Sequence, residues 1–155
     1  MPTHLQDEIK QTKPFARRSD EALLSILRTA TVLEHGSNEI LRAHGITTTQ
    51  YNVLRILRGA GSAGLCGREI GERLVSTVPD VSRLLDRMEQ MDLLAKERDP
   101  ADRRHVTARI TAKGRRILTA SAPALTKFSR GRVERLSART IEALVEALEK
   151  IREGV

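Results

Sequence analysis

Basic side chains gather in one part of this 155-residue chain. The segment 96–116 holds eight Lys and Arg against three Asp and Glu, so it carries +5 of the chain's formal net charge of +7. Guanidinium and ammonium groups at this density bind phosphates, and a focused basic excess favours a polyanionic partner, nucleic acid or an acidic membrane surface. The eight residues are Lys96, Arg98, Arg103, Arg104, Arg109, Lys113, Arg115 and Arg116.

No residues with the spacing of a metal site or a catalytic centre accompany this charge. The four histidines lack metal-ligand spacing, and the single cysteine, Cys66, cannot complete a zinc set. No Gly-rich phosphate loop follows a strand, and neither Ser-x-x-Lys nor Gly-x-Ser-x-Gly occurs. We therefore predict that the protein is not an enzyme and uses no metal or cofactor, and we expect Cys66 to be a small residue that is buried or partly buried.

An amphipathic helix is predicted just upstream, from about Thr77 to Met91. Thr77 and Asp80 fit a capping box, and Pro79 is tolerated in a first helical turn. One face is apolar and holds Val78, Val81, Leu84, Leu85 and Met88. The polar side offers the candidate binding residues Ser76, Thr77, Pro79, Asp80, Ser82, Arg83 and Arg87.

The elements around this helix predict a helix-turn-helix followed by a hairpin. A short helix over 68–74 precedes it, after a glycine-rich connector at 59–67. Two strands, 93–98 and 105–110, follow it and are joined by a turn rich in Asp, Pro and Arg. The candidate hairpin residues are Lys96, Arg98, Asp102, Arg103 and Arg104.

Long helices are predicted at both ends of the chain. One runs from about 19 to 43, and another begins after Thr111 and is interrupted by Pro123. The last, 137–152, carries an apolar seam with few residues left to cover it, so a second subunit is the natural cover. The candidate pairing residues are Leu23, Leu27, Ile141, Leu144, Leu148 and Ile151.

Composition places the chain in a broad class. The length suits one domain, and with 39% hydrophobic but only 2% aromatic residues the core must be aliphatic. No apolar run is long enough for a membrane span, and the first residues lack a signal-peptide core. We expect a cytoplasmic protein whose residues 1–18 form an arm, either frayed or touching a partner subunit or DNA.

The segment 75–114 resembles the recognition helix and wing of MarR-type transcriptional regulators. The wing signature of that family is Asp-x-Arg followed by a hydrophobic-Thr pair, here Asp102-Arg103-Arg104 and Ile110-Thr111. The resemblance implies a mainly α fold with a small β-hairpin wing, in which residues 19–155 form a single domain. Its dimerisation helices would be 19–45 and 112–155, and its winged helix-turn-helix DNA-binding lobe 47–111.

The resemblance also implies partners. A homodimer would bind a pseudo-palindromic DNA operator, with the helix in the major groove and the wing in the minor groove. A small effector, often phenolic or lipophilic, would bind near His35, His44, Tyr51 and Arg55, although ordinary packing also explains these residues. Some members sense oxidation through a cysteine in the first long helix, a position that Cys66 does not match.

Several assignments stay open from sequence. Arg83 and Arg87 either read DNA or pair with the neighbouring acids Asp80 and Asp86. Of Arg103 and Arg104, one enters the minor groove and the other fixes the turn with Asp102. Lys96 and Arg98 would contact phosphates. The alternatives to an effector-released repressor are a ligand-independent repressor, a nucleoid-type architectural protein, and a protein-interaction module that has lost DNA binding.

Overall fold

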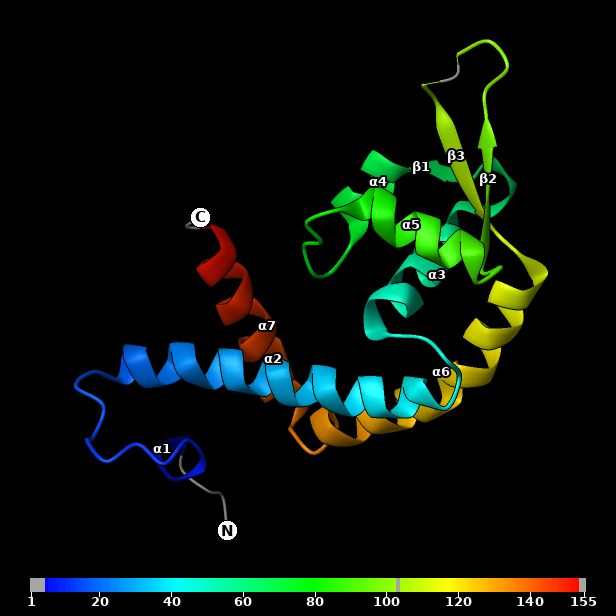
Figure 1. Ribbon diagram of the computed structural model, residues 1–155. Coiled ribbons are helices and arrows are strands. Elements are labelled where there is room, and N and C mark those ends of the chain that lie inside the picture. Colours follow the sequence, from blue (N-terminus) through cyan, green and yellow to red (C-terminus); the bar gives the residue numbers. More distant parts are fainter. Residues whose placement is uncertain (1–4, 103, 154–155) are drawn as a thin grey trace.

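The computed structural model describes residues 5–102 and 104–153, and it is mainly helical with one small sheet. Long helices α2, α6 and α7 form one part, and α3, α4, α5 and three strands form a compact lobe (Figure 1). This architecture agrees with the predicted fold class. The helices are α1 (Leu5–Glu8), α2 (Arg18–Arg42), α3 (Thr48–Ala60), α4 (Gly67–Arg73), α5 (Val81–Gln90), α6 (Ala112–Val133) and α7 (Ala138–Glu153), and the strands are β1 (Leu65–Cys66), β2 (Leu94–Arg98) and β3 (Val106–Ile110).

The sheet is antiparallel with the order β1-β3-β2. Strands β2 and β3 are the predicted hairpin, whereas β1 lies in the glycine-rich segment that was predicted to be only a connector. Gly64 makes this approach possible because its φ is +67° and a Cβ there would lie 2.5 Å from the carbonyl oxygen of Ala108. A two-residue strand shows no alternation of its own, so the sequence pattern could not indicate it.

The core is aliphatic, as the composition predicts. It lies within the lobe, between α3, α5 and the sheet, and continues to the end of α2 and the first half of α6. The side chains that are less than 2% exposed include Leu41, Val53, Leu54, Leu57, Ile70, Met88, Leu93, Leu94 and Leu118. The lobe is thereby joined to the long helices by packed apolar side chains, which fix its position on them.

Helices α2 and α6 pack against each other. Gly36 lets them approach because a Cβ at this position would overlap the ring of Phe128. The expected interruption at Pro123 is wrong, since α6 continues through it as a single helix. Proline removes one backbone donor, but the helix goes on where surrounding packing compensates for the lost hydrogen bond.

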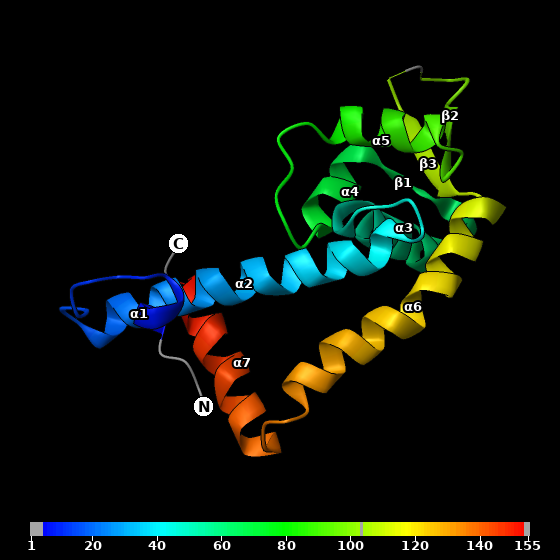
Figure 2. The ribbon, with the colours of Figure 1, turned by 60° about the horizontal axis from the view of Figure 1, so that its bottom comes forward.

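The described part of the N-terminal arm lies beside the start of α2 (Figures 1 and 2). Leu5 of α1 is buried, and Glu8 Oε2 lies 3.6 Å from Arg28 Nε of α2. These contacts fold residues 5–8 back onto the long helix. Across 5–102 and 104–153, no helix is long and apolar enough to cross a membrane.

Candidate nucleic-acid interface

Helix α5 begins at Val81, four residues later than the sequence pattern predicts. Asp80 is the N-cap, and its Oδ1 accepts a hydrogen bond of 2.9 Å from the backbone N–H of Arg83. The predicted cap at Thr77 is therefore wrong. Pro79 explains the shift, because a proline disfavours helical backbone at the residue before it, here Val78. Three candidate residues, Ser76, Thr77 and Pro79, accordingly lie in the exposed loop before the helix rather than on it.

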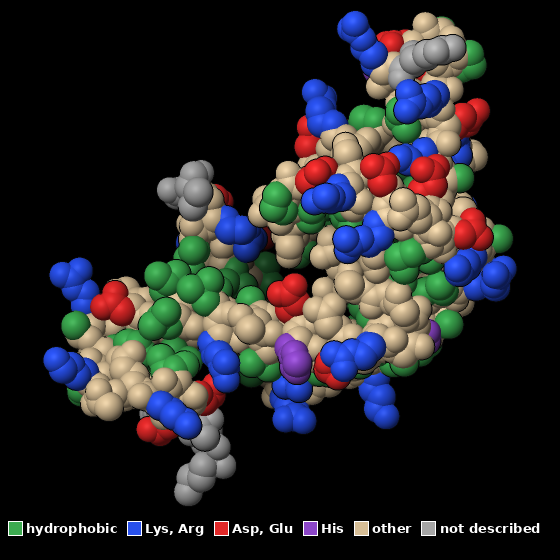
Figure 3. All heavy atoms as spheres, viewed as in Figure 1, with side chains coloured by type: hydrophobic (Ala, Val, Ile, Leu, Met, Phe, Trp, Pro, Cys, Tyr) green, Lys and Arg blue, Asp and Glu red, His purple; other side chains and the backbone are tan. Residues whose placement is uncertain are grey.

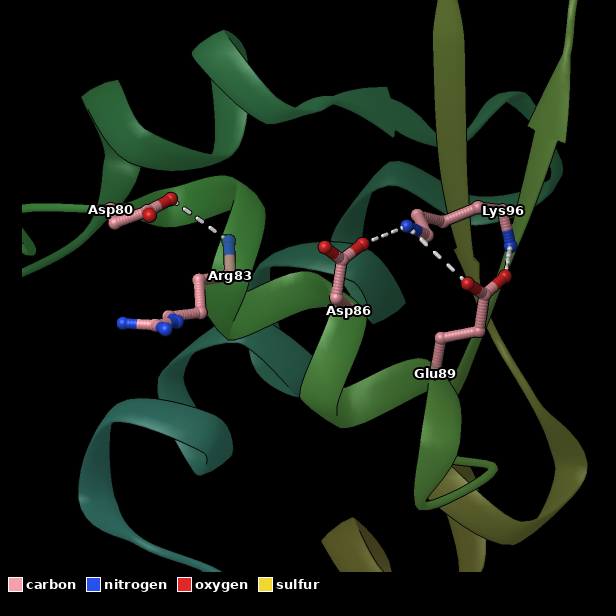
Figure 4. A network of polar contacts seen from close by, with 5 residues as sticks. All are labelled: Asp80, Arg83, Asp86, Glu89 and Lys96. Carbon is pink, nitrogen blue, oxygen red and sulfur yellow. Dashed lines mark hydrogen bonds and ion pairs between the residues drawn. The ribbon is translucent and has the colours of Figure 1, made fainter.

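The two faces of α5 differ in burial. Leu85 and Met88 are buried in the core, whereas Ser82, Arg83 and Arg87 are exposed. Within the described residues, the side chains of Arg83 and Arg87 make no hydrogen bond or ion pair, although Asp80 and Asp86 lie close to them in sequence. Asp80 caps the helix and Asp86 pairs with Lys96 of β2, as Figure 4 shows beside the free Arg83 side chain. Both guanidinium groups therefore remain available.

Helix α4 supports α5 in the arrangement of a helix-turn-helix. Ile70 of α4 is fully buried, and α4 packs against α5. The loop between them is tied to α3, because the backbone N–H of Val75 donates to Asn52 Oδ1 at 2.9 Å. The Val75 side chain itself is 89% exposed. This hydrogen bond holds the loop before α5 against α3.

The wing turn is organised by two aspartates. Asp99 Oδ1 accepts from Ala101 N at 2.8 Å, and Asp102 Oδ1 accepts from Arg104 N at 3.0 Å. These are side-chain-to-backbone bonds of the kind that stabilise tight turns. Asp102 therefore shapes the turn through the backbone of Arg104, whereas the sequence pattern predicts a pairing of Asp102 with an arginine side chain. Arg103 lies outside the described residues.

The basic residues of the wing divide into two groups. Among the described residues, Arg98 and Arg104 are exposed and make no hydrogen bond or ion pair through their side chains. Three others are engaged within the lobe. Arg109 donates to Ser62 O at 2.7 Å and to Glu97 Oε2 at 2.6 Å, Lys113 donates to Met91 O at 2.8 Å, and Lys96 contacts Asp86 and Glu89. On the visible face, Lys and Arg side chains extend from the wing and the lobe with acids between them (Figure 3).

A cavity of about 610 Å³ lies between α2, α3, α6 and the loop before α5. Tyr51 and Arg55 line it, as predicted for a ligand pocket, whereas His35 and His44 do not. Arg130 and Leu125 of α6 also line it but were not singled out from the sequence. A sequence pattern could not indicate these two residues as part of the cavity. Helix α6 is distant from α3 in the chain, and the side of α6 that faces the cavity depends on how α6 packs on α2.

Cys66 is partly buried at the start of α4. Its backbone N–H donates to Glu69 Oε2 at 2.9 Å. This hydrogen bond to the charged form holds the pKa of Glu69 below its ordinary value of 4.5. Within the described ranges, no group of three or more His, Cys, Asp and Glu is placed to hold a metal ion.

A helix-turn-helix with an adjoining antiparallel wing is the winged-helix DNA-binding fold. The family model described as the MarR family matches residues 44–105. The transcriptional regulator HosA of Escherichia coli O157:H7 is 33% identical over 106 residues, which cover 68% of this chain and 77% of HosA. The regulator MgrA of Staphylococcus aureus is 31% identical over 123 residues, with 74% and 82% covered.

Solved structures agree with these sequence relatives. Sco3205, a MarR family regulator from Streptomyces coelicolor solved in complex with DNA, is 25% identical and superposes with a TM-score of 0.79 over 93% of this chain and 92% of that one. The chain belongs to the MarR family of DNA-binding transcriptional regulators, which confirms the resemblance seen in residues 75–114. HosA and MgrA are both named as transcriptional regulators and not as enzymes.

Proposed function

We propose that the protein is a homodimeric transcriptional repressor that binds a pseudo-palindromic operator and leaves it when a small effector binds. The observation that carries the DNA-reading part is the pair of unengaged guanidinium groups of Arg83 and Arg87 on the exposed face of α5. An arginine in this position can donate two hydrogen bonds to a guanine edge in the major groove. Arg83 is the stronger base reader because it lies in the first turn, where base contacts concentrate.

The flanking residues would place α5 on the duplex. Ser76, Thr77 and Ser82 can donate to phosphates or base edges, and Pro79 offers an apolar contact to a thymine methyl group. Arg98 and Arg104 would contact the backbone and the narrow minor groove, where the potential is most negative. Arg103 is assigned to the same wing surface from the sequence signature alone.

Exposed apolar residues at both ends of the chain support a homodimer. Leu23 and Leu27 of α2 are each 55% exposed, and Leu144 and Ile151 of α7 are 44% and 53% exposed. No residue of α7 is buried within the described chain. Such a helix gains burial from a second subunit, together with the half-buried Ile141 and Leu148. A two-fold pair would present two α5 helices to half-sites about one helical turn apart.

The cavity supports release by an effector. Its wall combines apolar side chains with Arg55 and Arg130, which outnumber the acid Glu34, and this combination suits an aromatic or lipophilic acid. Val75 and Ser76 of the loop before α5 form another part of the wall, and Asn52 both lines the cavity and holds the Val75 N–H. A ligand that displaces this hydrogen bond would move the loop that leads into the recognition helix.

The DNA-reading proposal is tested by selecting duplexes from a randomised library with the purified protein. We expect one enriched pseudo-palindrome whose affinity falls steeply with salt, because phosphate contacts release counterions. Arg83→Ala should reduce the preference for that duplex over a scrambled one by roughly 1–3 kcal/mol. Equal affinity for both duplexes at moderate salt, without a footprint, would favour an architectural DNA-binding protein instead.

The effector proposal has a separate test. Benzoate and its hydroxylated derivatives should raise the melting temperature and weaken operator binding in the unchanged protein. Arg55→Ala should reduce both effects without changing operator affinity in the absence of ligand. Tight operator binding that no such acid weakens would favour a ligand-independent repressor.

A further inference from the structure

Lys96 connects the wing to the recognition helix. Its ammonium group contacts Asp86 Oδ1 and lies 3.3 Å from Glu89 Oε2, and both acids belong to α5. Its backbone N–H also donates to Glu89 Oε1 at 3.0 Å. The Glu89 carboxylate therefore contacts both the backbone N–H and the side-chain ammonium group of Lys96 (Figure 4). Only 22% of the Lys96 side chain is exposed.

The alternation of β2 places Lys96 on the inner face of the sheet. Leu94 lies two residues before it on the same face and is buried, and Lys96 pairs across the ladder with the buried Ala108. The neighbouring Ala95 and Glu97 point to the opposite face. Lys96 thus faces α5, and there it meets two acids spaced three residues apart on one side of the helix.

These contacts fully engage the ammonium group. Its hydrogen bond to Asp86 raises the pKa of Lys96, assisted by Glu89 and opposed by partial burial. Lys96 therefore stays charged and bound to α5 at physiological pH. Arg98, two residues further along the same face of β2, makes no side-chain hydrogen bond or ion pair within the described chain, so two similar cations occupy different environments.

The Lys96 link adds a polar attachment to contacts nearer the base of the hairpin. There, Leu94 and Ile110 are buried in the same core cluster as Leu85 and Met88 of α5. Thr111 Oγ1 donates to Asp92 O at 2.6 Å, and Lys113 Nζ donates to Met91 O at 2.8 Å. An attachment further along β2, beyond the buried Leu94, restricts changes in the angle between the wing and α5.

We propose that Lys96 is a positioning residue, which holds the wing at a fixed angle to α5 so that both elements engage DNA together. This assigns Lys96 a role other than the phosphate contact expected from sequence. The inference rests on the proposed function. Its physical basis is preorganisation, because elements already held in register lose less conformational freedom on binding.

The experiment compares Lys96→Met with Arg98→Met in the full-length protein, using the duplex enriched by the unchanged protein and a scrambled duplex. We expect Lys96→Met to lower the ratio of the two affinities roughly tenfold, within the range of coupled contacts, with little change in salt slope. Arg98→Met should weaken binding to both duplexes alike and reduce the salt slope by about one. Lys96→Arg can still reach both acids and should keep the unchanged ratio.

A second variant gives opposite predictions for the two roles. Asp86→Asn combined with Glu89→Gln removes negative charge near DNA and frees the Lys96 ammonium group. If Lys96 were a phosphate contact, this variant would bind both duplexes more tightly, with a steeper salt slope and unchanged discrimination. If Lys96 positions the wing, the variant loses discrimination, and adding Lys96→Met lowers it little further, because the link is already broken.

The results separate this inference from the proposed function. Normal discrimination by the unchanged protein, together with Lys96→Met behaving like Arg98→Met, would overturn the positioning role alone. Unchanged discrimination by the Asp86→Asn/Glu89→Gln variant would do the same, whatever its overall affinity. Failure of the unchanged protein to prefer any duplex would overturn the proposed function and this inference with it. Thermal unfolding of every variant identifies any loss of binding caused by misfolding.

Discussion

The N-cap of the recognition helix links stability to DNA reading, and Asp80→Ala tests that link. Asp80 is extended, with φ −139° and ψ 90°, and its Oδ1 accepts the Arg83 N–H at 2.9 Å. Alanine would leave this donor without its partner. The same first turn carries the Arg83 side chain, so a frayed cap would also loosen the side chain proposed to read a base.

The magnitude follows from the loss of one cap. Replacing an N-cap Asp by Ala typically costs about 1 kcal/mol, within a range of roughly 0.5–2 kcal/mol. For a protein of this length, that loss lowers the melting temperature by about 2–4 °C. Asn at position 80 keeps an acceptor for the cap but removes the charge, so Asp80→Asn should lose only the smaller contribution of an acid at a helix N-terminus.

The assay measures urea unfolding and binding to the selected and scrambled duplexes for Asp80→Ala and Asp80→Asn. Both variants lose one negative charge facing DNA, so both should bind the scrambled duplex more tightly by a similar factor. Only Asp80→Ala should lose discrimination, because only it frees the first turn. Equal stability and equal discrimination in the two variants would refute the argument that Asp80 acts through the cap.

Three further predictions concern other parts of the fold. A Cβ at Gly114 would overlap a backbone carbonyl oxygen, so Gly114→Ala should reduce the free energy of unfolding in urea by about 3 kcal/mol; the control Gly131→Ala, with nothing within 4 Å, should not. The lowered pKa of Glu69, bonded to Cys66 N–H, contributes stability above pH 4.5 that is lost as pH falls through the folded-state pKa. The stability gap between the unchanged protein and Glu69→Gln should therefore shrink on acidification. Leu27→Asp should shift sedimentation toward the monomer while leaving the circular dichroism spectrum unchanged.

The start of α5 shows what a sequence pattern can decide. The apolar positions Leu85 and Met88 were predicted correctly because helical spacing identifies a buried face. The first residue was not, since Thr77 and Asp80 are both good caps and either fits the pattern. The restriction that Pro79 places on the backbone of Val78 favours Asp80 as the N-cap. This restriction therefore predicts the observed start of the helix.

The cavity shows where sequence reasoning ends. Tyr51 and Arg55 of α3 line the cavity, and their role in ligand binding stays a prediction. His35 and His44 were chosen as polar residues on or beside the same helices, but the cavity lies elsewhere. Its wall includes Arg130, whose direction depends on the packing of α6 against α2. Such a wall forms only when segments distant in the chain come together.

In the wing, the number of basic residues does not indicate which of them are free to contact DNA. The excess of +5 over 96–116 predicts that this region contacts DNA, yet Lys96, Arg109 and Lys113 bind groups of the lobe itself. Strand alternation already separates Lys96 from its neighbours, because a residue two positions from the buried Leu94 must share its inner face. The cations left for phosphate are those without an internal partner, and the salt dependence of binding should therefore follow Arg98 and Arg104 rather than the total charge.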